Sequence, residues 1–363
     1  RPLLVRAPLT GDLPLAPGYC AVDFAPLDET DRRTAWQRML RAHGFDAGPA
    51  SALASRFSVG PAVMQRACAA VAAGPEPAAL EPALAGFVRQ HRSSRIASIA
   101  TRVERLASWD DLIVPDDIAD GLRELCARVQ HRGTVLAAWG LAGVASTARG
   151  VTALFQGGPG TGKTMAAEVV ARALGYELWR VDLSRVVSKW IGETEKNLAT
   201  VFDAAEDGEI VLLFDEADSL FAKRTEVKSS HDRGANLETS YLLQRLDAFT
   251  GIAILTTNHG TAIDPAFRRR LSMQAVFPFP DEADRERLWR ALLPRTVPTA
   301  GDLDLGELAR RFQLTGGYIR NAVLRAAYLA ASRGTPLSTA DLERAVRAEF
   351  LAHGKVSASG ALG

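Results

Sequence analysis

The sequence predicts an α/β fold whose main domain is built on a parallel β-sheet, with helical segments before and after it. The first observation is the order of residues 151–174: a short apolar, β-prone run, a glycine-rich turn, and an Ala-rich run that favours a helix. The second is the continuous apolar run at residues 210–214, which is typical of a strand buried on both faces of a parallel sheet. Residues 252–257 form a third such run.

The glycine-rich turn matches a phosphate-binding pattern. Its sequence, GGPGTGKT at residues 157–164, fits G-x-x-x-x-G-K-[ST] and lies between the expected strand and helix. Glycines let successive backbone N–H groups surround an anion, and a helix N-terminus adds partial positive charge. Lys163 is placed to reach the terminal phosphates of a nucleoside triphosphate, and Thr164 to hold a magnesium ion. The expected nucleotide contacts of this segment are Gly157, Gly158, Pro159, Gly160, Thr161, Gly162, Lys163, Thr164 and Met165.

The composition excludes several classes of protein. With 363 residues the chain is expected to fold into two or three compact units. Lys and Arg number 43 and Asp and Glu 42, so no overall basic field points to nucleic acid. The cysteines, Cys20, Cys68 and Cys126, lack metal-ligand spacing and fit reduced thiols in a cytosol. The sequence has neither a run of about 18 apolar residues nor a recognisable signal peptide, and its start at Arg1 suggests a piece of a longer protein.

Two segments far apart in the chain resemble each other. Residues 28–40 match residues 281–293, sharing Asp-Glu-x-Asp-Arg and a Trp at the same spacing, and residues 53–59 match residues 308–314. We therefore expect residues 20–95 to form the same small helical bundle as the C-terminal end. The alternative is a DNA-binding helix-turn-helix at residues 53–70, whose second helix offers only Gln65 and Arg66 to nucleic acid.

The chain is expected to have three parts. An amphipathic helix over residues 89–106 would connect the first part to the second, and Asp116 or Asp117 would cap a helix near the start of the second. The expected boundaries are residues 1–107 for the N-terminal helical region, 108–282 for the nucleotide-binding domain and 283–363 for the C-terminal helical domain.

Polar side chains follow the second and third apolar runs. Asp215 and Glu216 come directly after residues 210–214, at the carboxyl end of the strand, where parallel sheets bind ligands. In phosphoryl transfer, Asp215 would stabilise magnesium and Glu216 would orient and activate the attacking water. Asn258 follows residues 252–257 and is placed to hold the same water from the other side.

The order of these motifs resembles the AAA+ ATPases of the AAA clade, from about residue 109 to the C-terminus. The motifs are GGPGTGKT, SKWIGETEKN at residues 188–197, LLFDEAD, LTTN and DPAFRRR. The resemblance implies an αβα parallel-sheet domain with a C-terminal helical lid, and a ring of six subunits that binds ATP and Mg²⁺ between neighbours. It also implies that Asn258 senses the nucleotide and that Ile113 and Gly317 contact it.

Three consecutive arginines, Arg268, Arg269 and Arg270, follow the motif Asp-Pro-Ala-Phe. They are either surface charge or a group that stabilises transition-state charge in a neighbouring subunit. The resemblance favours Arg269 and Arg270 for the second role, although the loop is shorter than the family's Arg-x-Gly-Arg arrangement. The expected catalytic residues are Lys163, Asp215, Glu216, Asn258, Arg269 and Arg270, and the expected metal ligands are Thr164 and Asp215.

The segment Lys189, Trp190, Ile191 and Gly192 resembles the pore loop of the family, which grips an extended polypeptide inside the ring. A bulky aromatic side chain packs against any sequence, so Trp190 suits such a role. The alternative is a Trp buried in the helical layer. Because Ser, Lys, Gly and Glu surround Trp190, the sequence favours the pore loop.

Within the group, three segments most resemble ATPases of bacterial extracellular contractile, phage-tail-like injection systems. These are VVSKWIGETEKNL, HDRGANLETSYLLQRLD and TGGYIRNAVLRAAYLAA. The resemblance implies a cytoplasmic ring that loads, remodels or disassembles such a machine, and it makes the N-terminal repeat a second copy of the lid. The alternatives are a protein unfoldase of another pathway, a nucleotide-switched scaffold and a DNA- or RNA-dependent ATPase. Intact Lys163, Asp215, Glu216 and Asn258 argue against the scaffold.

Overall fold

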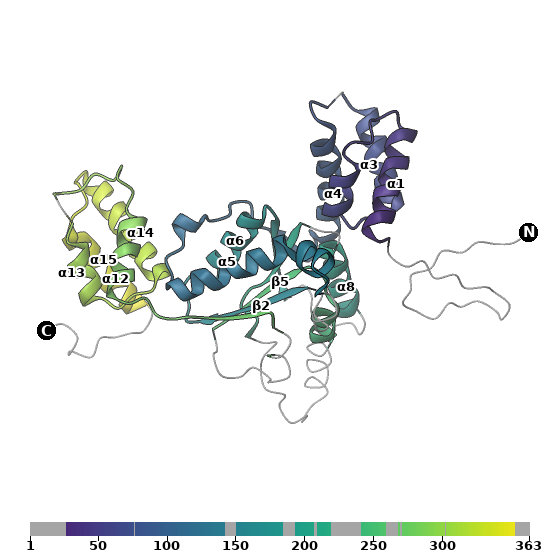
Figure 1. The fold of residues 1–363 in the computed structure, drawn as a ribbon. Coiled ribbons are helices and arrows are strands. Elements are labelled where there is room, and N and C mark those ends of the chain that lie inside the picture. Colours follow the sequence, from purple (N-terminus) through teal and green to yellow (C-terminus); the bar gives the residue numbers. More distant parts are fainter. Residues whose placement is uncertain are drawn as a thin grey trace, which may run out of the picture. The chain divides into compact units, whose positions relative to one another are not determined.

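The computed structural model (Figure 1) describes most of the chain between residues 27 and 352. The described ranges are residues 27–75, 77–141, 150–183, 193–206, 209–218, 241–258, 268, 271–301 and 303–352. The chain divides into two compact units, residues 1–90 and residues 91–363. The second unit holds the sheet and the C-terminal helices.

The sheet has six strands, in the order β1-β3-β4-β5-β2-β6. The three expected strands are confirmed as β2 (Val151–Gly157), β4 (Ile210–Phe214) and β5 (Ile252–Thr257), which are parallel neighbours. The sheet also contains β3 (Glu177–Val181) and β6 (Met273–Phe277), both parallel to their neighbours, and the short edge strand β1 (Ala100–Arg102), antiparallel to β3. The α/β prediction with a parallel sheet is therefore correct.

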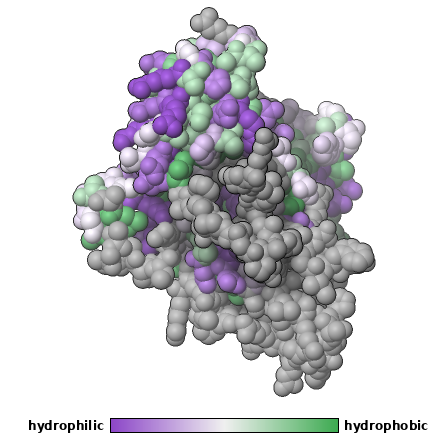
Figure 2. Space-filling view, turned by 90° about the vertical axis from the view of Figure 1, so that its right-hand side faces the viewer, coloured by the Kyte–Doolittle hydropathy of each residue, from purple (hydrophilic) through white to green (hydrophobic). Residues whose placement is uncertain are grey.

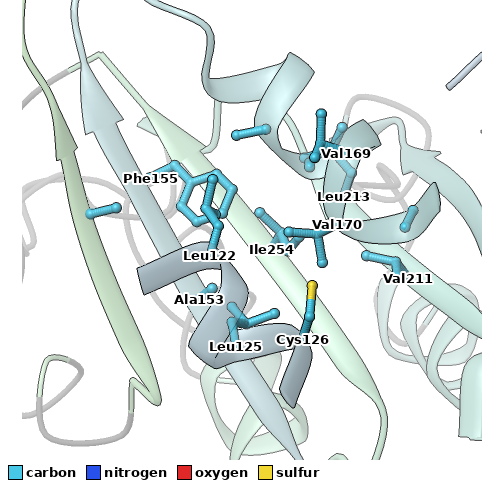
Figure 3. Packing of buried hydrophobic residues seen from close by; sticks show 14 of the residues in the cluster. Leu122, Leu125, Cys126, Ala153, Phe155, Val169, Val170, Val211, Leu213 and Ile254 are labelled. Carbon is cyan, nitrogen blue, oxygen red and sulfur yellow. The ribbon is translucent and has the colours of Figure 1, made fainter. Parts of the chain in front are cut away.

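Helices cover both faces of the sheet. On one face, α5 (Asp116–Gln130) and α6 (Lys163–Leu174) bury apolar side chains against β2, β4 and β5. Figure 3 shows this layer, with Leu122 and Leu125 of α5 and Val170 of α6 packed over Phe155 and Ile254. On the other face, α8 (Glu193–Glu206) packs Val201 and Phe202 against Leu212 and Phe214. β2, β4 and β5 are buried along nearly their whole length because both of their faces are covered, and most of their residues are apolar.

Two local predictions are wrong. The expected connecting helix over residues 89–106 does not continue that far, since α4 (Leu80–Ile96) ends earlier and residues 100–102 form β1. The open edge of β3 explains this, because it offers backbone partners that a helix would leave unpaired. The N-cap of α5 is Pro115, with no side-chain cap, and Asp116 and Asp117 lie in the first turn, where their charge still favours the helix dipole.

The C-terminal part is a bundle of four helices, visible in green and yellow in Figure 1. They are α12 (Glu282–Leu292), α13 (Leu305–Arg311), α14 (Gly316–Arg333) and α15 (Thr339–Ala352). Trp289, Phe312, Ile319 and Val346 are in its core. Helical structure in this region was expected from the sequence.

The N-terminal unit also contains four helices, and no strand occurs among its described residues. They are α1 (Glu29–Ala42), α2 (Ala50–Arg56), α3 (Pro61–Ala73) and the first part of α4. Trp36, Leu53, Phe57 and Val88 are in its core.

Hydrophilic residues cover much of the described surface on the face of the molecule that Figure 2 shows.

The two bundles share the same arginine contact. In the N-terminal bundle, Arg32 of α1 donates from Nε to the carbonyl oxygen of Ala54 at 3.0 Å and from Nη1 to that of Leu27 at 2.7 Å. In the C-terminal bundle, Arg285 of α12 donates from Nε to Ala309 O at 2.7 Å and from Nη1 to Pro280 O at 2.7 Å. The aligned sequence segments thus make the same hydrogen bonds.

Further contacts agree between the bundles. Trp36 and Trp289 are fully buried, and neither indole N–H has a hydrogen-bond partner among the described residues. After the second helix of each bundle, an arginine guanidinium lies over a phenylalanine ring, Arg56 over Phe57 at 5.4 Å and Arg311 over Phe312 at 5.2 Å. The same two arginines form ion pairs with the fourth helix, through Glu81 and Glu343 respectively, each at 2.7 to 2.8 Å.

Candidate active site

The phosphate loop connects β2 to α6, as the sequence predicts. Three of its glycines have positive φ angles, +150° at Gly157, +75° at Gly160 and +102° at Gly162, a region that L-residues with side chains rarely occupy. α6 begins directly afterwards at Lys163. Its N-terminal N–H groups and the loop N–H groups therefore meet at one place, which favours an anion.

Lys163 is buried at the centre of the loop, with 8% of its surface exposed. Its ammonium donates to the carbonyl oxygens of Gly157 at 2.7 Å and Gly158 at 2.8 Å, and to Oδ1 of Asn258 at 3.0 Å. Burial lowers the pKa of Lys163, while the nearby carboxylates of Asp215, Asp218 and Glu216 oppose the shift. The ammonium thus has three acceptors and lies between the loop and the end of β5.

The end of β4 lies beside the first turn of α6. Thr164 Oγ1 is 3.1 Å from Asp215 Oδ1, so these two expected metal ligands are adjacent. Arg180 of β3 approaches the other carboxylate oxygen, with Nε 3.6 Å from Asp215 Oδ2. The hydroxyl of Thr256 donates to Asp215 Oδ1 at 2.7 Å, which fixes the carboxylate from the side of β5.

Glu216 has a left-handed backbone conformation, with φ of +53°. Such a conformation costs a non-glycine residue free energy and needs local support. The support is a hydrogen bond from its N–H to Thr256 Oγ1 at 2.9 Å. Its side chain is exposed, so the carboxylate is available to a ligand at this edge of the sheet.

Asn258 follows β5 and contacts two charged groups. Besides Lys163, it meets Asp218, whose Oδ1 accepts a hydrogen bond from the Asn258 backbone N–H at 2.9 Å. The Asn258 side-chain nitrogen lies 3.5 Å from Asp218 Oδ2. The hydroxyl of Thr257 also donates to Asp218 Oδ1.

A cavity of about 600 Å³ adjoins the phosphate loop and has the size of a small-molecule site. The loop, the segment before α5, the end of β6 and the helices α12 and α14 line it. Its apolar side chains, such as Val114 and Leu288, suit a flat heterocyclic ring, while Lys163 and Thr164 lie at its phosphate-binding end. The predicted residues in the lining are Ile113, Gly160, Thr161, Gly162, Lys163, Thr164, Met165 and Gly317.

The remaining predicted residues have different positions. The carbonyl oxygens of Gly157 and Gly158 accept hydrogen bonds from the Lys163 ammonium, and Pro159 is exposed at the turn of the loop. Arg268 is exposed. The predicted residues Lys189, Trp190, Ile191, Gly192, Arg269 and Arg270 lie outside the described residues.

Sequence reasoning missed four residues that the structure adds to the site: Arg180, Asp218, Thr256 and Thr257. The signal was available for three of them, because Thr256 and Thr257 directly precede Asn258 and Asp218 is the last residue of LLFDEAD. Arg180 is one of many arginines and carries no such signal.

Comparisons with known proteins agree with this geometry. Residues 153–279 match the family "ATPase family associated with various cellular activities (AAA)". The cell division cycle protein 48 homolog of Archaeoglobus fulgidus is 34% identical over 170 residues, which are 46% of this chain and 23% of that protein. The katanin p60 ATPase-containing subunit A1 of Strongylocentrotus purpuratus is 33% identical over 60% of this chain and 44% of that protein. A mitochondrial sorting homolog of Caenorhabditis elegans is 29% identical over 66% of this chain and 72% of that protein.

The chain spans less than half of the length of the archaeal and sea-urchin relatives. Among the described residues, no helix is both long and apolar enough to cross a membrane. The matched segment contains most of β2, all of β3 to β6, the phosphate loop, Asp215, Glu216 and Asn258. Residues 153–279 are therefore similar to an AAA domain, and this similarity covers the strands and the loop that position the site.

Proposed function

We propose that this chain binds ATP in the cavity beside the phosphate loop and hydrolyses it to ADP and phosphate. The observation that supports this most strongly is the meeting of Lys163, the Thr164–Asp215 pair and Asn258 at the carboxyl ends of β2, β4 and β5. Glu216 adds an exposed carboxylate at the same edge. A cation, a pair of oxygen ligands, a general base and a polar amide are the groups that phosphoryl transfer to water requires.

Magnesium fits the oxygen atoms of this site. Thr164 Oγ1 and Asp215 Oδ1 lie 3.1 Å apart, and hydroxyl and carboxylate oxygens are the ligands that Mg²⁺ prefers, together with phosphate oxygens and water. Thr164 would bind the ion and Asp215 would hold it directly or through its water shell. When bound, Mg²⁺ neutralises charge on the phosphates. Lys163 exchanges its loop acceptors for phosphate oxygens, and Glu216 accepts a proton from the attacking water.

Two variants test hydrolysis at this site. Lys163→Ala is expected to abolish binding of a fluorescent ATP analogue, whereas Glu216→Gln is expected to keep binding and to lose turnover by about 100-fold or more, because only the general base is removed. Phosphate release by the purified chain measures turnover. Normal turnover in Glu216→Gln would contradict the role of this carboxylate. An unaltered chain that shows no turnover would contradict the proposed function.

We propose further that the chain works as a motor on protein substrates. The resemblance of residues 188–197 to an aromatic pore loop supports this. So does the match of residues 153–279 to the AAA family, because the resemblance described above implies rings that act on proteins. In this proposal six subunits form a cytoplasmic ring, Trp190 grips the polypeptide, and Arg269 and Arg270 complete a neighbour's site. The finer proposal, action on components of a bacterial contractile injection system, rests on the resemblance of three segments alone.

The N-terminal bundle is, in our proposal, a second copy of the lid. Its support is the repeated pattern of contacts, in which Arg32 and Arg285 bridge the same two carbonyl positions. The proposed organisation is thus a lid-like unit with a connecting segment to residue 107, a nucleotide-binding domain over residues 108–282 and a lid over residues 283–363. Pro61 and Ala62 begin α3 where Gly316 and Gly317 begin α14, so the N-terminal copy lacks the glycine pair of the nucleotide cavity.

A further inference from the structure

The side-chain amide of Asn258 lies between a cation and an anion. Its Oδ1 is 3.0 Å from the ammonium of Lys163, and its Nδ2 is 3.5 Å from Oδ2 of Asp218. Asp218 itself is fixed, because its Oδ1 accepts hydrogen bonds from the backbone N–H of Asn258 and from the hydroxyl of Thr257. The carboxylate therefore cannot turn away without losing two better hydrogen bonds.

Chemistry alone decides which way this amide faces. An ammonium only donates hydrogen bonds and a carboxylate only accepts them. Turning the Asn258 amide by 180° would place its NH₂ against the Lys163 ammonium and its oxygen against the Asp218 carboxylate, two repulsive contacts in a partly buried site. The orientation with the oxygen toward the phosphate loop is therefore strongly preferred.

We propose that Asp218 is a positioning residue that makes Asn258 present a hydrogen-bond acceptor, rather than a donor, to the reacting groups. This inference rests on the proposed ATP hydrolysis. An acceptor at this place binds an O–H of the attacking water or an N–H of Lys163, whereas the NH₂ group would bind a phosphate oxygen. Asn258 thus orients the water together with Glu216, and the amide contributes little to ATP affinity.

The first test is a double-mutant cycle on turnover. Asp218→Asn keeps the shape of the side chain but offers Asn258 an NH₂ donor. Once Lys163 has exchanged the Asn258 oxygen for phosphate oxygens, the Asn258 amide therefore gains by turning its oxygen toward residue 218 and away from the site. We expect kcat to fall by about 10- to 100-fold, as for other supporting groups of a reactive centre, with the ATP affinity retained. In an Asn258→Ala background, Asp218→Asn should lower kcat little further, because Asp218 acts through that amide.

Two controls make this cycle decisive. Asp120→Asn removes a carboxylate that is exposed and paired with Arg123 on the surface, so it should leave kcat unchanged. The melting temperature of each variant, measured by thermal unfolding, shows whether a loss of kcat comes from a general loss of structure. Turnover that stays normal in Asp218→Asn, multiplicative losses in the double variant, or a loss of ATP affinity equal to the loss of kcat would each overturn the inference.

A second measurement does not depend on hydrolysis. In the nucleotide-free chain, the Asn258 side-chain NH₂ group gives a pair of ¹H–¹⁵N NMR signals, identified by their loss in Asn258→Ala. We expect Asp218→Asn to shift this pair strongly and Asp120→Asn to leave it in place. If the unaltered chain shows no turnover but Asp218→Asn shifts the signals, the proposed function is contradicted and the inference about the amide is kept. If the unaltered chain turns over ATP but Asp218→Asn does not shift the signals, the inference is contradicted.

Discussion

The backbone N–H of Gly317, in the first turn of α14, donates a hydrogen bond to the carbonyl oxygen of Gly160 in the phosphate loop at 3.2 Å. The packing around this contact is tight, since a Cβ at Gly160 would lie 2.6 Å from Thr315 Oγ1 and 3.2 Å from Gly317. The glycine-rich loop and the first turn of α14 therefore touch through Gly160 and Gly317. A side chain at either glycine would therefore disturb the packing of the loop against α14.

Gly160→Ala is expected to weaken ATP binding, because the added methyl group pushes against Thr315 and because φ of +75° strains any L-residue. The backbone strain alone costs about 1–2 kcal/mol, or about 5- to 30-fold in an equilibrium constant. Titration with a fluorescent ATP analogue measures the affinity. Gly175→Ala is the matched control, since its φ is +72° with no atom within 4 Å of the new Cβ, and it should lower stability without lowering affinity.

Thr256→Val tests the link between the two carboxylates. The hydroxyl of Thr256 donates to Asp215 and accepts from the N–H of Glu216, and valine keeps its shape without the oxygen. Loss of these contacts, at about 1–3 kcal/mol for an unsatisfied group, should lower kcat by about tenfold or more while the fold is kept. Steady-state phosphate release measures this. A variant with unchanged kcat would show that Asp215 and Glu216 are fixed by other contacts.

Arg285→Lys and Arg32→Lys test the repeated contact of the two bundles. Lysine has one ammonium group and cannot reproduce the two directed hydrogen bonds of a guanidinium. Because charged hydrogen bonds contribute about 1.5–3 kcal/mol each, Arg285→Lys should clearly lower the stability of the C-terminal bundle, in which Arg285 is buried. Arg32 is less buried, so its loss should cost less. Hydrogen exchange resolves each bundle separately, and protection that is unchanged in both would contradict the prediction.

Asp341 gives the C-terminal bundle a predictable response to pH. The guanidinium of Arg333 and the hydroxyl and N–H of Ser338 hold the pKa of Asp341 below its usual value of 3.8. Because the folded state favours the ionised form, this contribution is complete well above pH 3.8 and is lost as the pH falls through the lowered pKa. The difference in melting temperature between the unaltered chain and Asp341→Asn should therefore be largest near neutral pH and shrink below pH 4. A difference that stays constant from pH 7 to 3 would contradict this.

Trp190→Ala tests the proposed motor. If Trp190 grips polypeptide, its loss should remove most of the stimulation of ATP hydrolysis by an unfolded protein such as casein, without changing the affinity for ATP. A chain that unfolds on this substitution would instead favour a Trp buried in the helical layer. Stimulation by DNA or RNA and not by casein would favour the nucleic-acid alternative.

The sequence was sufficient for the elements whose signal is local. β2, the phosphate loop and α6 follow one another in 24 residues from Val151 to Leu174, and each has a distinct pattern of apolar residues or glycines. That Thr164 and Asp215 both serve a magnesium ion is expected from known phosphoryl-transfer chemistry, and the structure brings the two side chains within 3.1 Å of each other. In contrast, β1 was missed because its three residues are defined by the free edge of β3, which is 75 residues or more away in the chain. The role of Asp218 depends likewise on Lys163 and Asn258, which come together only in the folded sheet.

The position of β1 has a practical consequence for work with the isolated ATPase domain. A fragment that began at residue 108, the boundary that the sequence suggests, would lack β1 and expose the N–H and C=O groups of β3 along one edge of the sheet. Uncovered strand edges pair with other chains, so this fragment is expected to aggregate. A fragment that begins before Ile96 keeps the edge covered and retains the apolar contacts of Ile96 and Ile99 with the sheet.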